Sequence, residues 1–201
     1  MRKLLTVFIL ISATLLSSCA LSPIKTVPYK SYTITNWKNA PAPTQSISHK
    51  TLLVTTPIAS PGYTSAKMIY VMIPYELRSF GDHRWVAPPA ELLLPLLTDR
   101  IRATGYFHAV VATPYLGVSN YQLNTRLLAL QQEFLQPQSE VRLKMQATIM
   151  NVATGRVIAS REFQAVVPAS ENNPYAGVIA TNQAAHIVTN QIAQFVIRKV
   201  R

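Results

Sequence analysis

The side chain with the most distinctive chemistry in this chain is the thiol of Cys19, the only cysteine among 201 residues. It follows a basic start (residues 1–3) and an apolar run of 13 residues (4–16). This order is typical of a secretory signal, and the run is too short for a permanent transmembrane helix, which needs about 20 apolar residues. Exported proteins rarely keep an idle thiol, so the sequence predicts that Cys19 is modified.

The residues that end this signal, Leu16-Ser17-Ser18-Cys19, resemble the lipobox of bacterial lipoproteins. That resemblance implies cleavage before Cys19, a diacylglycerol on its sulfur and acylation of the new amine. Several acyl chains hold a protein on a membrane almost permanently, because each buried methylene contributes about 0.8 kcal/mol. Ala20, in place of Asp, implies by the same resemblance delivery to the outer membrane, with the domain facing the periplasm. The alternative is that Cys19 is an ordinary small residue near the cleavage site.

The rest of the chain shows no recognisable catalytic or metal-binding pattern. Its acidic residues are few, and neither Glu91 nor Asp99, which share a predicted helix, falls in a known motif. The histidines lack a His or Cys partner at metal-ligand spacing; they are His49, His83, His108 and His186. No G-x-S-x-G motif and no phosphate-binding glycine loop is present. We therefore expect a protein that is not an enzyme and carries no cofactor or metal besides the lipid on Cys19.

One charged and aromatic cluster, Asp82-His83-Arg84-Trp85, stands out in a predicted loop (79–84) before the first helix. Trp85 can serve as an anchor in the core, with its polar edge near the surface. The alternative is that Asp82, Arg84 and Trp85 contact a partner, because Trp and Arg are enriched in the hot spots of interfaces.

The chain is strongly basic, with a formal net charge of +11, or +9 once the signal with its two basic residues is removed. Such a charge attracts anionic headgroups, lipopolysaccharide or an acidic protein patch. A solvated surface with few acidic residues would explain the same balance. No run of five to eight basic residues marks a nucleic-acid patch, so we expect no nucleic-acid partner.

The sequence predicts three segments: a signal peptide (1–18), a Pro/Ser/Thr-rich tether (19–50) that includes a short strand near 29–34, and one folded domain (51–201). Strands are predicted at 51–56, 67–75, 107–112, 121–132, 141–149 and 156–167, and helices at 88–104 and 174–198. The strand at 141–149 alternates strictly between apolar and polar residues. Short links between the last three strands predict an antiparallel meander.

Both predicted helices carry one apolar face. Leu93, Leu97 and Ile101 recur at helical spacing in the first, and Gly105 suits its left-handed end. Pro95 either kinks this helix or marks its first turn. Packing both faces on one sheet predicts an α+β fold: a two-layer sandwich with a mixed, mostly antiparallel sheet and two main helices on one face.

The order of these features resembles the ABC-type transport auxiliary lipoproteins, a family that includes PqiC-type outer-membrane lipoproteins. The lipobox is followed by the D-x-R-W-like cluster at residues 82–85, a leucine-rich helix that ends at Gly105, a strand beginning with Tyr121, the turn at 153–157 and a long final helix. Pro95 and the pair Pro88-Pro89 depart from the family pattern at the first helix.

The resemblance implies an outer-membrane docking component for a transport system. Its partners would be an MCE-domain protein with an ABC permease and ATPase, which move lipid between the two membranes. The alternatives are a direct carrier of lipid or lipopolysaccharide, a structural lipoprotein of another envelope or secretion complex, and an enzyme with a histidine beside a carboxylate. A homo-oligomer is compatible with such a system, although no heptad or self-complementary patch predicts one.

Overall fold

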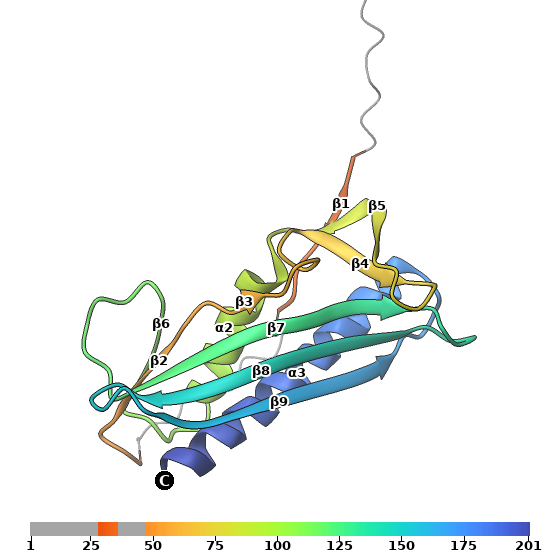
Figure 1. The fold of residues 1–201 in the computed structure, drawn as a ribbon. Coiled ribbons are helices and arrows are strands. Elements are labelled where there is room, and N and C mark those ends of the chain that lie inside the picture. Colours follow the sequence, from red (N-terminus) through yellow and green to blue (C-terminus); the bar gives the residue numbers. More distant parts are fainter. Residues whose placement is uncertain (1–27, 36–46) are drawn as a thin grey trace, which may run out of the picture.

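The structure is a computed structural model that describes residues 28–35 and 47–201. The predicted signal and Cys19 lie outside the described residues. The described strands form one open, mixed sheet, and the two described helices cover one face of it (Figure 1), so the fold is the predicted α+β two-layer sandwich. No helix within the described ranges is long and apolar enough to cross a membrane.

One side of the sheet is an antiparallel meander of three long strands, β7 (Tyr121–Glu133), β8 (Glu140–Asn151) and β9 (Val157–Pro168), with β9 at the edge. In β8 every second side chain is buried against the helices, as the alternation predicted. The β8–β9 turn places Gly155 at φ 65°, a conformation that L side chains rarely adopt.

Shorter strands complete the other edge of β7. Three of them, β2 (Thr51–Val54), β3 (Ile58–Ala59) and β4 (Lys67–Val71), pair with β7 in succession along its length, all parallel to it. Beyond β2 lies β6 (Ala109–Ala112), again in parallel pairing. Beyond β4 come β5 (Arg78–Trp85), antiparallel to β4, and β1 (Lys30–Tyr32), parallel to β5.

Two helices, α2 (Pro89–Arg102) and α3 (Pro174–Val200), pack on each other and on the same face of the sheet. Leu93, Leu97 and Ile101 are fully buried, which confirms the predicted face. The helix begins at Pro89, so Pro95 is an interior residue and does not start it. Because Pro95 has no N–H, the carbonyl of Glu91 lacks its helical donor, and the exposure of Pro95 lets water reach this part of the helix.

The predicted loop at 79–84 is wrong, because these residues lie inside strand β5. The pairing of β5 with β4 shifts between Lys67 and Ile69, which pair with Arg84 and Ser79. The extra residues form a bulge that breaks the alternation a strand normally shows in its sequence. The short strand predicted near 29–34 is confirmed as β1, which pairs with the end of β5.

Candidate functional site

The cluster predicted to touch a partner lies at the sheet edge where β1 meets β5. Trp85 is 3% exposed and packs in the core, so the residues that a partner could reach are Asp82 and Arg84. The guanidinium of Arg84 lies 4.5 Å from the centre of the Tyr29 ring. Asp82 contacts Nδ1 of His83 at 2.7 Å, and this hydrogen bond lowers the pKa of the Asp82 carboxyl.

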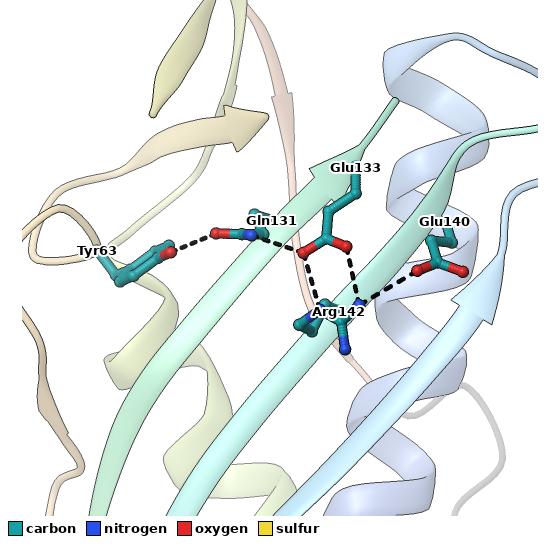
Figure 2. A network of polar contacts seen from close by, with 5 residues as sticks. All are labelled: Tyr63, Gln131, Glu133, Glu140 and Arg142. Carbon is teal, nitrogen blue, oxygen red and sulfur yellow. Dashed lines mark hydrogen bonds and ion pairs between the residues drawn. The ribbon is translucent and has the colours of Figure 1, made fainter. Parts of the chain in front are cut away.

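A polar network lies on the face of the sheet opposite the helices, where β7 ends and β8 begins (Figure 2). Arg142 donates to both carboxylate oxygens of Glu133, at 2.8 and 2.9 Å, and to Glu140 at 3.3 Å. Gln131 donates to Glu133 at 2.7 Å, and Tyr63 donates to Gln131. The hydrogen bonds from Arg142 are the main cause that lowers the pKa of Glu133. These contacts satisfy one another, so the network is built to hold strands together.

No group of three or more His, Cys, Asp or Glu side chains in the described part of the chain could hold a metal ion. In the polar network two carboxylates share the single guanidinium of Arg142, so its charged groups contact one another on neighbouring strands. The functional surface must therefore be sought where side chains line a cavity.

One cavity, which we call the α2–α3 groove, has a volume of about 800 Å³ and runs between the two helices and the chain segment that follows β1. Its apolar wall includes Leu96 of α2 with Ile179 and Ile187 of α3. The segment that follows β1 forms the third wall. Asn182 holds it in place, because the side-chain oxygen of Asn182 accepts a hydrogen bond from the Thr35 N–H at 2.8 Å. The helices and a sheet strand thus share one apolar cavity.

A second cavity, the arginine cleft, lies near the C-terminal ends of α2 and α3 and has a volume of about 400 Å³. Arg100, Arg198 and Arg201 line it, and Arg100 also lines the α2–α3 groove. Arg100 donates to His186, and burial together with the Arg100 charge lowers the pKa of this histidine. Sequence reasoning missed the cleft. The available signal was that no acidic residue follows Glu171 while four basic groups do, counting His186.

Two loops expose large apolar side chains at the two ends of β7. One, between β4 and β5, exposes Tyr75 at φ 71°. The other, between β6 and β7, exposes Leu116 and Val118. Such exposure makes both loops available for contacts with other molecules.

Comparison with known proteins identifies a family and similar folds. A family model described as "ABC-type transport auxiliary lipoprotein component" matches residues 32–193. The fold is similar to the crystal structure of a Xanthomonas campestris protein of family DUF330, with a TM-score of 0.76 and 22% identity over 85% of this chain and 96% of that chain. A hypothetical protein of Chlamydia trachomatis is similar at a TM-score of 0.51 and 6% identity, over 76% of this chain and 98% of that chain. No curated protein matches the sequence significantly. At these identities the solved structures show a shared fold.

Proposed function

Because the chain belongs to the ABC-type transport auxiliary lipoprotein family, we propose that it is the docking component of an MCE-type lipid transport system. A lipid on Cys19 holds it at the outer membrane, and its domain faces the periplasm. There it meets an MCE-domain protein, whose ABC permease and ATPase lie in the inner membrane.

The observation that carries this proposal is the family match over residues 32–193, which includes strands from both edges of the sheet and most of the helix layer. The lipobox-like Leu16-Ser17-Ser18-Cys19 supports the membrane anchor. The described residues fit a binding role, because their charged side chains pair within structural contacts or line open surfaces.

Co-purification of the full chain from detergent extracts tests the docking function. We expect an MCE-domain protein and ABC components to be recovered with the wild type and less of them with Arg84→Glu, because Arg84 is exposed beside β1. Arg161→Glu is the matched control, since Arg161 is an exposed arginine on β9, across the sheet from β5. Repeated recovery of no transporter component with the wild type would overturn the proposal.

The anchor is tested separately with Cys19→Ala. Without the thiol no acyl group can be attached, so the protein should leave the membrane fraction or remain with its signal uncleaved. Metabolic labelling with a radioactive fatty acid should mark the wild type alone. A processed Cys19→Ala chain that still floats tightly with membranes would contradict the anchor.

The α2–α3 groove favours a second candidate function, direct binding of lipid. Ligand sites commonly measure about 300–1,000 Å³ and combine apolar side chains with polar groups that orient the ligand. This groove is of that size and combines apolar side chains of both helices with polar groups such as Asn182 and Gln183. Mass spectrometry of a chain that begins at residue 20 is the test. Stoichiometric bound lipid would support a carrier, and its absence would exclude one.

A further inference from the structure

We propose that the arginine cleft binds a phosphate group, and that the α2–α3 groove beside it takes the acyl part of the same ligand. The proposal deepens the second candidate function and rests on it for the acyl part. The ligand class is an anionic amphiphile with a phosphate in its headgroup.

The charge balance of the cleft is the first argument. Arg100, Arg198 and Arg201 gather around one cavity, and none of them forms an ion pair with a described acidic side chain. Elsewhere in the described chain arginines next to acids do pair, as Arg142 does with Glu133. Three unpaired cations around a cavity repel one another, and a bound anion removes that repulsion.

The donor geometry is the second argument. An arginine carries five N–H donors in a planar fork that matches phosphate oxygens in a bidentate way. Arg100 uses one terminal nitrogen on His186, which leaves its other donors available to the cleft. Asn190, Gln194 and Thr104 add uncharged polar groups to the lining. A phosphate would thus meet donors from both helices.

The shared wall of the two cavities is the third argument. Arg100 lines both, so a ligand whose headgroup lies in the cleft can extend past Arg100 towards the groove. Leu96, Ile179 and Ile187 then offer apolar surface to an acyl chain; Ile179 is 44% and Ile187 41% exposed. Covering these side chains with an acyl chain removes apolar surface from water.

Calorimetric titration of the full chain in nonionic detergent tests the proposal with three probes. They are dihexanoyl phosphatidylglycerol, glycerol 3-phosphate and inorganic phosphate. We expect the lipid to bind more tightly than glycerol 3-phosphate, because only the lipid fills the groove. Arg100→Gln should weaken the binding of the lipid about tenfold, the effect of losing one charge-assisted hydrogen bond. Arg161→Gln, on β9, is the control and should bind like the wild type.

The other outcomes separate the two parts of the ligand. If all three probes bind equally and Arg100→Gln weakens each of them, the phosphate site stands and the groove assignment is overturned. If the lipid binds and Arg100→Gln has no effect, the cleft assignment is overturned. Arg198→Gln, at the other helix, repeats the comparison in case Arg100→Gln unfolds the protein. Co-purification with transporter components reports on docking independently, so loss of phosphate binding and loss of docking are distinguishable.

Discussion

At the scale of single residues, Glu133 has the most enclosed carboxylate among the described ion pairs, with a side chain 8% exposed. It lies at the end of β7 and accepts hydrogen bonds from Arg142 of β8 and from Gln131 of its own strand. A charge so enclosed is stable only while its donors remain, because removing one partner leaves the other unpaired. The contact therefore ties the ends of two long strands together.

Replacing Glu133 with glutamine tests that role. Glu133→Gln removes the charge from a bidentate contact, and we expect the free energy of unfolding to fall by about 1–3 kcal/mol in urea denaturation. Glu162→Gln is the matched control: Glu162 pairs with Lys144, and both side chains are more than one third exposed. Exposed pairs contribute about 0–1 kcal/mol, so the control should change little. Equal losses in the two variants would contradict the structural role of Glu133.

The same residue predicts a dependence on pH. Hydrogen bonds from Arg142 hold the pKa of Glu133 below its ordinary value of 4.5 in the folded state. The unfolded chain therefore binds more protons in acid, so the contact stabilises the fold fully above about pH 5 and loses this effect as the pH falls through the folded pKa. Between about pH 5 and pH 3 the unfolding free energy of the wild type should fall more steeply than that of Glu133→Gln. Parallel curves would contradict the assignment.

Single residues differ in how far the sequence alone reveals them. Leu93, Leu97 and Ile101 are predictable, because helical spacing within one segment marks the buried face. Glu133 and Arg142 are not, because their meeting depends on the register between two strands. The arginine cleft is likewise assembled by the packing of α2 on α3, which joins Arg100 to residues almost one hundred positions later.

At the scale of elements, α2 contains a proline that its packing does not require. Pro95 is exposed and leaves the carbonyl of Glu91 without a helical donor. Pro95→Ala should raise the unfolding free energy by about 1–3 kcal/mol, the helical penalty of proline less the entropy that it removes from the unfolded chain. Thermal unfolding followed by circular dichroism measures the change as a midpoint higher by several degrees.

The control for this prediction is Pro89→Ala at the first helical position, where proline is tolerated because the N–H has no helical acceptor. Because Pro89 is buried, its replacement also removes packed atoms, so its midpoint should be no higher than that of the wild type. A Pro95→Ala midpoint at or below that of the wild type would show that the proline is compatible with the helix at no cost.

Strand β5 shows why one element was predicted incorrectly. Gly81 and Asp82 interrupt its apolar pattern, and the bulge opposite Lys67 and Ile69 removes the regular alternation on which a strand prediction depends. Its pairing on both sides, with β4 and β1, supplies the hydrogen bonds that make it a strand. Both partners precede β5 in the sequence, and its pairing with β1 joins Lys30 to His83, so no local window contains the information.

At the scale of the whole molecule, Asn182 joins the two layers. Its side-chain oxygen accepts from the Thr35 N–H, while its nitrogen donates to the Val178 and Thr33 carbonyls at 2.9 and 3.3 Å. This residue therefore holds the segment after β1 against α3. The sequence predicted both layers and the apolar faces of the helices. It did not predict the hydrogen bond between Asn182 and Thr35, which joins residues separated by 147 positions.

Hydrogen exchange tests this connection. In Asn182→Ala the amide of Thr35 loses its acceptor and should exchange about tenfold faster, the equivalent of one lost hydrogen bond. Amides in the centre of β8 should be unchanged. Asn190→Ala is the matched control, because Asn190 is an exposed asparagine about two turns further along α3. Unaltered exchange at Thr35 in Asn182→Ala would show that β1 pairing alone holds the segment.

The place of β1 in the sheet has a mechanical consequence for a chain held by a lipid at Cys19. Only ten residues separate Cys19 from Lys30, so the attachment point lies within about 40 Å of the sheet edge when the chain is fully extended. Any pull between the membrane and a bound partner is then applied to β1 along its own axis. Because β1 and β5 are parallel and in register over Lys30–Tyr32, such a force shears their hydrogen bonds together. The load that this lipoprotein can bear is therefore set by the rate at which a three-residue strand leaves its neighbour.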